Sequence, residues 1–303
     1  MAKKNDGDLI IDFNGTKRIE WLNVVSQYFD LPVNTKQTTV YVNLNDIDNI
    51  DELEPIHLVL LACFRQSLND KGYKNCYLAT DNQALSKFLF EDINLGQYWL
   101  GKKPENHTES SDETIFNLWR VIDTEKEDYS DKVHRYLKRK FFQHKDLSSV
   151  KLSLLEIFYN IFDHAEAKGN AFSLVKYNRQ NQKLYVAVCD FGKGIATTIK
   201  SYYKNITTDK EAILMATEST VSTKSKSHNM GMGIGNVIDN LGDNDILRIV
   251  SNSGFLYVTS GIKKTFQLKN DFRGTLIYYE ISLSNFDDEE IIDNFDFSDY
   301  NDI

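Results

Sequence analysis

The sequence predicts an α+β protein, in which a small α/β domain precedes a larger two-layer α/β sandwich. Two observations support this fold class. In the second half of the chain the helical segments come first and the strand-like segments later, and helices packed on an antiparallel sheet are the natural solution for that order. In the first half, strand-like and helical segments alternate at lengths typical of a small α/β sheet domain.

A polar linker separates the two halves. Residues 102–113, KKPENHTESSDE, hold the last proline of the chain and show no apolar periodicity. We therefore expect one domain over residues 1–105 and a second over residues 113–285. Residues 286–303 form an acidic tail, for which a solvated end is the default. The alternative is a partner-docking segment whose aromatic side chains become buried on binding.

Regular elements follow one another along the first half, beginning with an apolar stretch at residues 9–13. Apolar residues at helical spacing predict helices over 19–29, 55–71 and 82–90. Pro55 stands in the first turn of the second of these, where proline is tolerated. The patterns TVYVNL and NCYLA predict strands at 39–44 and 75–79, and residues 92–99 form a loop or a short element.

The second half begins with a helical region that we expect to run from residue 114 to about residue 142. A second helix with a broad apolar face is predicted over 149–165. Two hairpins follow, one pairing 171–177 with 183–189 and the other pairing 245–251 with 255–260, and the last strand covers 275–283.

Composition excludes several classes of protein. The formal net charge is −9, but eight acidic residues and no basic one lie in residues 286–303, so the remainder is close to neutral and lacks the basic face of a nucleic-acid binder. Three widely spaced cysteines without a CxxC pair indicate buried thiols in a reducing compartment. No apolar run approaches the roughly 18 residues of a membrane helix, so we expect a cytoplasmic protein without a membrane partner.

The first segment with chemical potential lies inside the helix predicted over 149–165. Glu156, Asn160 and His164 are spaced four residues apart, which aligns them on one helix face. An amide oxygen is a suitable ligand for Mg²⁺, and a carboxylate one turn away can polarise a water molecule or a hydroxyl nucleophile. The alternative is a surface helix that carries three polar residues by chance.

The second segment follows the apolar strand at 184–189. Asp190 stands at the strand end, where its carboxylate can accept a hydrogen bond from an exocyclic amine. Gly192 and Gly194 let the backbone turn tightly after it. By itself this pattern is also that of an ordinary glycine turn.

The third segment is glycine-rich and leads into a helix that ends near residue 240. Gly231, Gly233 and Gly235 would expose backbone amides at a helix N-terminus, which can bind phosphate. The spacing is GxGxG rather than GxGxxG, and no parallel strand precedes it, which excludes a Rossmann site. The GK[ST] ending of a P-loop is also missing.

Together, ExxxNxxxHA, DxGxGI and GxGxG resemble, in this order, the N, G1 and G2 boxes of the GHKL (histidine-kinase-like) superfamily over residues 114–284. This resemblance implies a Bergerat ATP-binding fold and ATP with Mg²⁺ as cofactors. It implies that Asn160 coordinates Mg²⁺, that Glu156 is the general base and that His164 lies near the phosphates. It further implies that Asp190 receives the adenine amino group.

The resemblance also assigns the remaining candidate site residues. Gly192 and Gly194 would shape the adenine wall, and Gly231, Gly233 and Gly235 would let the phosphates approach the backbone. Thr275, in the pair Gly274–Thr275, would support the adenine contact. Residues 196–230 would form a lid rich in Lys, Ser and Thr, in which Lys224 is a candidate phosphate contact.

Among the branches of the superfamily, the sequence is most similar to the anti-sigma-factor Ser/Thr kinases. A sensor histidine kinase is disfavoured because no proline follows Pro104 and because His134 lies too close to Asn160 to belong to a separate phosphoacceptor hairpin. A transducer domain of the topoisomerase kind is not expected, because the sequence ends soon after Leu283.

The first half resembles a STAS-like domain in its element order, the alternative being an unrelated small α/β domain. The expected phosphoacceptor region reads IDELEP at residues 50–55, without Ser or Thr, which favours a docking or sensory role. The resemblance implies a protein partner, either a STAS-domain protein or a sigma-factor-like regulator, and leaves a homodimer open.

Two functions follow from these expectations. The first is an enzyme, a Ser/Thr protein kinase or slow ATPase in a partner-switching circuit. The second is a non-catalytic interaction module that ATP gates. Glu156 favours the enzyme.

Overall fold

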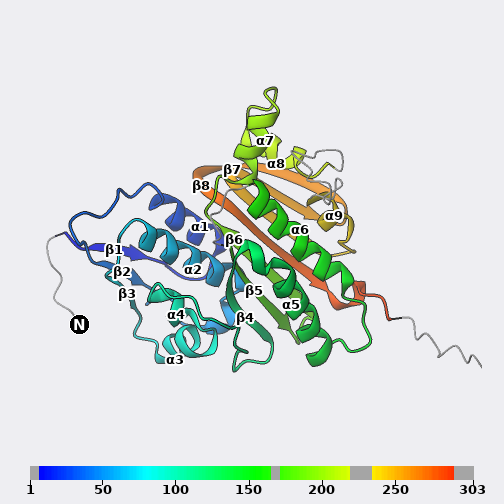
Figure 1. Ribbon diagram of the computed structural model, residues 1–303, viewed down its shortest axis with the longest axis horizontal. Helices are drawn as coiled ribbons and strands as arrows, with labels where there is room; N and C mark the ends of the chain where they lie inside the picture. Colours follow the sequence, from blue (N-terminus) through cyan, green and yellow to red (C-terminus); the bar gives the residue numbers. More distant parts are fainter. Residues whose placement is uncertain (1–6, 165–170, 219–233, 290–303) are drawn as a thin grey trace, which may run out of the picture.

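Two β-sheets organise the computed structural model, which describes residues 7–164, 171–218 and 234–289 (Figure 1). The small sheet is parallel, with the order β1-β2-β3, and comprises β1 (Leu9–Asp12), β2 (Val40–Asn43) and β3 (Cys76–Ala79). The large sheet is antiparallel, with the order β4-β5-β6-β8-β7. It comprises β4 (Ile115–Val121), β5 (Ala171–Asn178), β6 (Lys183–Asp190), β7 (Ile246–Thr259) and β8 (Ile262–Ser282). The α+β class predicted from the sequence is therefore correct.

Helix α2 (Pro55–Asp70) is the central element of the N-terminal part. Glu54 caps it, and the Glu54 backbone N–H donates to Nδ1 of His57 at 3.0 Å, so orphan backbone donors at the helix start are satisfied. Every residue from Pro55 to Arg65 is buried, as expected of a helix that is largely apolar on all sides. The other helices of this part are α1 (Arg18–Gln27), α3 (Gln83–Lys87), which continues into a π-helical turn at Phe88–Asp92, and α4 (Leu95–Trp99).

The two faces of the large sheet are covered by different parts of the chain. One face carries α5 (Lys126–Lys140) and α6 (Ser148–His164). The other face is covered by the N-terminal part, since Cys63 of α2 donates to the carbonyl oxygen of Cys189 at 3.6 Å and Tyr98 of α4 packs edge-on against Phe172 at 5.2 Å. The residues on the two sides of the linker therefore share one continuous hydrophobic core.

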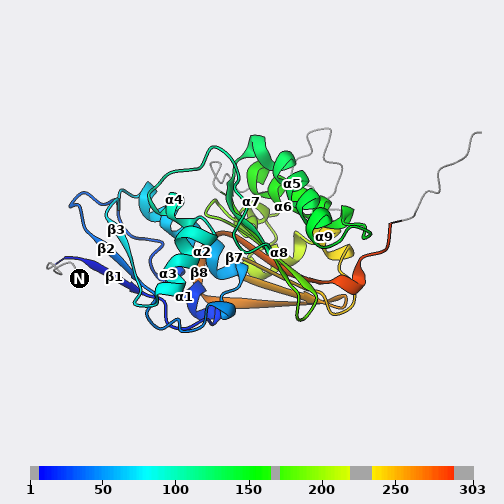
Figure 2. The same ribbon diagram turned by 90° about the horizontal axis from the view of Figure 1, so that it is seen from below.

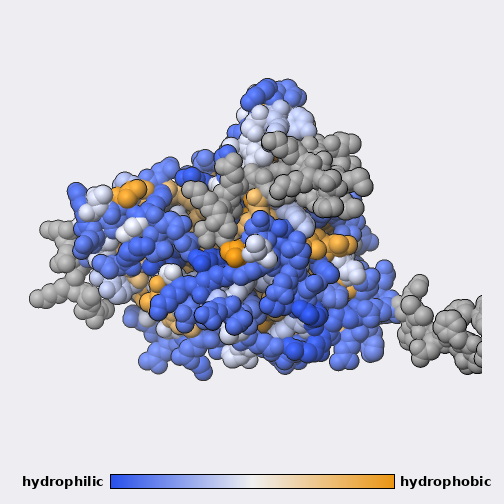
Figure 3. Space-filling model, in the orientation of Figure 1, coloured by the Kyte–Doolittle hydropathy of each residue, from blue (hydrophilic) through white to orange (hydrophobic). Residues whose placement is uncertain are grey.

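The remaining helices of the C-terminal part are α7 (Ile195–Tyr202), α8 (Asp209–Met215) and α9 (Ile234–Asp239). Figure 2 shows the small sheet at one end of the molecule and α5 and α6 over the large sheet toward the other. The face seen in Figure 3 is mainly hydrophilic, consistent with a core enclosed between these layers. Within the described ranges, the protein has no helix long and apolar enough for a membrane span.

One predicted helix begins too early. The segment from residue 114 was expected to be helical to about residue 142, but Ile115–Val121 forms β4 and only Lys126–Lys140 forms α5. β4 reads IFNLWRV and pairs with β5, so its apolar and aromatic side chains are buried on both faces of a strand. A short run that is buried on all sides has no periodicity that separates strand from helix.

The second predicted hairpin is also wrong. Residues 246–259 form one strand, β7, which pairs with β8 across a tight turn at Ser260 and Gly261, where both residues have positive φ. The sequence Asn252–Gly254 resembles a turn, but the β7–β8 register shifts there instead, as at a β-bulge. Gly254 lies against the backbone of Asp209, where a Cβ would come within 2.7 Å of the carbonyl oxygen.

Candidate functional site

Asp190 is the last residue of β6 and is completely buried. Its Oδ1 accepts a hydrogen bond from the Gly192 backbone N–H at 2.6 Å, and Thr275 of β8 is its register partner. Burial raises the pKa of Asp190 to about 7, although the polar groups of Gly192 and Thr275 act in the opposite direction. Its Oδ2 has no hydrogen-bond partner within the part of the chain that the structure describes. This buried acceptor atom is therefore oriented and available to a bound donor.

Two glycines allow the strands to approach closely at this point. Gly274 has φ of 106°, and a Cβ there would lie 2.7 Å from the Cα of Phe191 and still closer to the Asp190 carbonyl oxygen. Gly194 has φ of 79°, and its Cβ would lie 2.6 Å from the Gly274 carbonyl oxygen. Only glycine fits at positions 274 and 194. This explains why a glycine precedes Thr275 and why the DxGxG turn ends in a glycine.

Replacing Gly274 by Ala is expected to destabilise the protein much more than the same change at Gly261. Both glycines have positive φ, 106° and 74°, so both substitutions incur backbone strain. A Cβ added at position 274 would clash with backbone atoms, whereas a Cβ added at position 261 would meet nothing within 4 Å. We expect an extra loss of about 1–3 kcal/mol in the free energy of unfolding, measured by urea denaturation. Equal losses in the two variants would contradict the close approach.

Hydroxyl groups hold the start of α7 against the sheet. Asp190, Thr275 and Ser251 are register partners across β6, β8 and β7, so they share the face that α7 covers. The Ile195 N–H donates to Oγ1 of Thr275 at 3.3 Å, and the Ala196 N–H donates to Oγ of Ser251 at 3.2 Å. Ser251 in turn donates to the Gly274 carbonyl oxygen at 3.0 Å. Sequence reasoning missed Ser251, whose only signal is a polar residue at the end of an apolar strand.

Helix α6 carries the other predicted polar residues. Glu156 is half-buried, and burial raises the pKa of its carboxyl to about 7. One turn later, Asn160 donates from Nδ2 to the Glu156 carbonyl oxygen at 2.8 Å, which leaves its Oδ1 as an acceptor or ligand. His164 ends the helix, but its side chain lies outside the described residues.

These segments converge on one side of the large sheet. Helix α6 packs against α7, which starts at the Asp190 turn, and against α9, which carries the buried Gly235 in its first turn. Figure 1 shows all three helices on this side. Lys224, Gly231 and Gly233 lie outside the described residues, as does most of the second half of the predicted lid. The first half of that lid is not a plain loop, because it contains α7 and α8.

The N-terminal part also supports the Asp190 turn. Phe191 packs edge-on against Phe29, which follows α1, with ring centroids 4.4 Å apart, and against Phe272 of β8 at 5.7 Å. Phe29 and Phe272 are themselves 5.7 Å apart. A residue of the first predicted domain thus contacts the turn that bears the candidate site, and no local pattern indicated this contact.

Metal binding by a cluster of ionisable side chains is not a feature of the described residues. In the ranges 7–164, 171–218 and 234–289 no group of three or more His, Cys, Asp or Glu residues could hold an ion. The metal ligand predicted from the sequence is a single neutral oxygen, Oδ1 of Asn160. A site of that kind suits Mg²⁺, which usually takes only one or two protein ligands and completes its shell with water and phosphate.

Comparison with known proteins found no matching family model, no matching curated protein and no matching solved structure for this chain. Assignment of a function therefore depends on the motifs and on the geometry described above.

Proposed function

We propose that the C-terminal part binds ATP with Mg²⁺ in a Bergerat-type pocket of the GHKL kind. On this proposal the protein is a cytoplasmic Ser/Thr protein kinase of the anti-sigma type, or a slow ATPase, in a partner-switching circuit. The observation that supports it most strongly is the buried Asp190, whose Oδ1 is held by Gly192 while Oδ2 has no partner among the described residues. Buried polar atoms are normally paired, so such an atom beside a glycine turn favours a ligand that donates a hydrogen bond.

At the base end of the pocket, the adenine amino group would donate to Oδ2 of Asp190. Gly192 holds Oδ1 of the carboxylate, so the group needs little reorganisation when a base binds. A base that presents an acceptor instead of an amine would leave both groups unpaired, which costs roughly 1–3 kcal/mol for each buried group. The same geometry therefore favours adenine over guanine.

At the phosphate end, Oδ1 of Asn160 would hold Mg²⁺, which supplies charge neutralisation of the phosphates when bound. Glu156 lies one helical turn away and has a pKa of about 7. A carboxylate with a pKa near the operating pH can accept the proton of a hydroxyl or water nucleophile. This favours phosphate transfer to Ser or Thr of a partner, or hydrolysis, over passive binding.

The second candidate is an ATP-gated interaction module without catalysis. The packing of Phe29 on Phe191 favours it, because the N-terminal part contacts the residue next to Asp190. Nucleotide binding at the turn could then change a partner surface on the N-terminal part. In either case the partner would be a STAS-domain protein or a sigma-factor-like regulator, and a homodimer stays open. Incubation with γ-labelled ATP and candidate partners distinguishes the two, since label on protein or as free phosphate requires an enzyme.

Asn160→Ala is expected to remove most of the Mg²⁺ dependence of ATP binding. The wild-type protein should bind ATP more tightly with MgCl₂ than with EDTA, and we expect the variant to lose about tenfold or more of this gain, equivalent to about 1.4 kcal/mol. Calorimetric titration with and without Mg²⁺ measures both affinities. Asn181→Ala, an exposed amide in the β5–β6 turn, is the matched control. Full Mg²⁺ dependence in Asn160→Ala would move the metal site elsewhere.

A further inference from the structure

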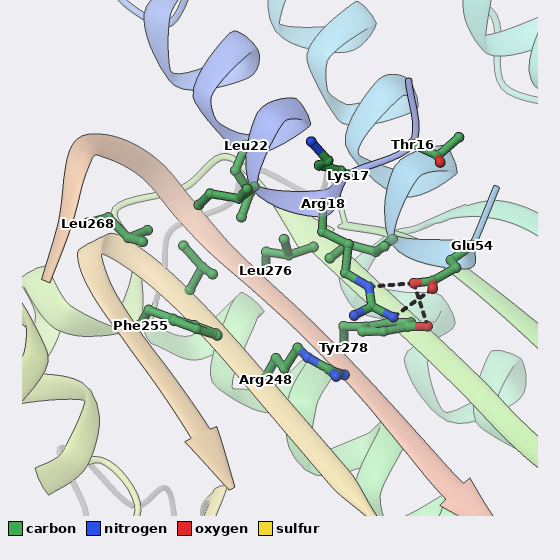
Figure 4. A pocket seen from close by; sticks show the side chains of 13 residues that line it. Thr16, Lys17, Arg18, Leu22, Glu54, Arg248, Phe255, Leu268, Leu276 and Tyr278 are labelled. Carbon is green, nitrogen blue, oxygen red and sulfur yellow. Dashed lines mark hydrogen bonds and ion pairs between the residues drawn. The ribbon is translucent and has the colours of Figure 1, made fainter. Parts of the chain in front are cut away.

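A cavity of about 520 Å³ lies between the start of α1 and strands β7 and β8 (Figure 4). Leu276 and Tyr278 of β8 line it, whereas Thr275, between Gly274 and Leu276, faces Asp190. Val250 of β7 lines it as well, while its neighbour Ser251 holds the start of α7. Because successive residues of a strand point to opposite faces, the cavity and the Asp190 site lie on opposite sides of the large sheet.

One end of the cavity is charged. Arg18 makes two hydrogen bonds with Glu54, from Nε and Nη2, each of 2.6 Å, and Tyr278 donates to the same carboxylate at 3.0 Å. Burial acts against ionisation of both partners, but their mutual attraction raises the pKa of Arg18 and lowers that of Glu54. Both groups therefore stay charged at neutral pH.

A second guanidinium, that of Arg248, lies at the same charged end of the cavity. Arg248 donates from Nη1 to Glu280 at 2.5 Å. The guanidinium carbons of Arg18 and Arg248 lie 5.3 and 5.5 Å from the Tyr278 ring centroid. Glu280 is also within 4 Å of Arg18 and Lys183, so three cations share the two carboxylates Glu54 and Glu280. The charged end therefore has a surplus of positive charge.

The opposite side of the cavity is apolar. Leu22 of α1, Phe255 of β7 and Leu268 of β8 face it on the side away from the Arg18–Glu54 pair, as Figure 4 shows. Val250 and Leu276 continue this wall along the sheet. The cavity thus joins a cationic end to an apolar wall, at the junction of the N-terminal part with the large sheet.

We propose that this cavity binds a small organic anion with an apolar body, such as a medium-chain or aromatic carboxylate. Its volume lies in the range of small-molecule sites, which are mostly apolar with a few orienting polar groups and are common where domains meet. Among the described residues Arg248 donates only through Nη1, so its other N–H groups can bind the ligand carboxylate while Glu280 keeps its partner. The apolar body lies along Leu22, Phe255 and Leu268. The Arg18–Glu54 pair closes the polar end and is not displaced.

The test uses the full-length protein without nucleotide and the fluorescent probe 8-anilinonaphthalene-1-sulfonate, an aromatic anion. We expect saturable binding of one probe per chain, displaced by octanoate and not by octylammonium. Arg248→Gln should weaken probe binding by about tenfold, because a charge-assisted hydrogen bond is lost. Arg179→Gln, at an exposed arginine outside the cavity, is its control and should match the wild-type protein.

A second variant keeps the test informative if Arg248→Gln fails to fold. Ile19 lines the cavity but is 48% exposed, so Ile19→Asp adds a negative charge with little cost to the fold. This variant should weaken probe binding by a similar factor, whereas Ile262→Asp, at a 56% exposed site on β8, should not. Equal displacement by octylammonium and octanoate would overturn the proposal. So would probe binding that is non-saturable or unchanged in Ile19→Asp. None of these results bears on the nucleotide proposal, because no nucleotide is present.

Discussion

Asp190→Asn is expected to abolish measurable ATP binding while stabilising the nucleotide-free protein at pH 8. The variant keeps the shape of the side chain and an oxygen for the Gly192 N–H. It replaces Oδ2, an acceptor that has no partner in the described part of the chain, by a donor. The adenine amino group would then face another N–H group. We expect a loss in affinity of at least about 100-fold, which calorimetric titration with ATP measures.

The gain in stability follows from the buried carboxyl. Its pKa is raised from 3.8 to about 7, so the folded state binds this proton more tightly than the unfolded state does. The resulting stabilisation is complete below pH 3.8, decreases as the pH rises and is lost above about pH 7. There the folded protein carries a buried charge at a cost of at most about 4 kcal/mol. Asn removes that charge, so the variant should be the more stable protein at pH 8, and the difference should shrink toward pH 4.

Urea denaturation at pH 5 and pH 8 measures this effect. Asp245→Asn is the matched control, since Asp245 is also buried at the large sheet but uses both oxygens, which accept from the Gly242 and Ser282 backbone N–H groups at 2.9 and 2.6 Å. An amide at that position turns one acceptor into a donor and should destabilise the protein at both pH values. Unchanged ATP affinity in Asp190→Asn would remove the adenine assignment.

Glu156→Gln is expected to slow phosphate release or transfer by about 10²–10⁴-fold while ATP·Mg²⁺ binds nearly as tightly as in the wild-type protein. The change preserves size and removes the proton-accepting carboxylate. In the wild-type protein the base is active only when ionised. Its pKa of about 7 therefore predicts a rate at saturating ATP that rises with pH and levels off above about pH 7. This step should disappear in Glu156→Gln.

Single-turnover rates with γ-labelled ATP, together with calorimetric affinities, separate this role from that of Asp190, which acts on binding. Glu127→Gln on α5 provides the control, since Glu127 is an exposed acceptor for Tyr159. A Glu156→Gln variant that keeps the wild-type rate would rule out the general base. Wild-type protein that neither releases nor transfers phosphate with any candidate partner would instead support the ATP-gated module.

Much of the fold was predictable because its signals are local. Two apolar runs within 171–190 flank a short polar turn, and they form the β5–β6 hairpin as predicted. Pro55 and the apolar run after it predicted α2, which begins at Pro55. The sequence also predicted Asp190 at a strand end before two glycines, and Glu156 four residues before Asn160 on one helix. In the structure Asp190 ends β6, and Glu156 and Asn160 both lie on α6.

Pairing between distant segments decided the rest. Residues 115–121 are a strand because β5 offers them a partner, and Asn252–Gly254 is a bulge because β8 continues past it. The apolar sequence of α2 indicates burial but not that its cover is the large sheet. Ser251, Phe29 and the cavity beside Arg18 become functional candidates only when β7, β8 and α1 meet. The sequence by itself determined the type of those segments whose signal is local, such as α2 and the β5–β6 hairpin, through turn chemistry and side-chain pattern. Only the tertiary structure decided which buried faces meet, because packing between segments far apart in the chain leaves no periodic signal in either one.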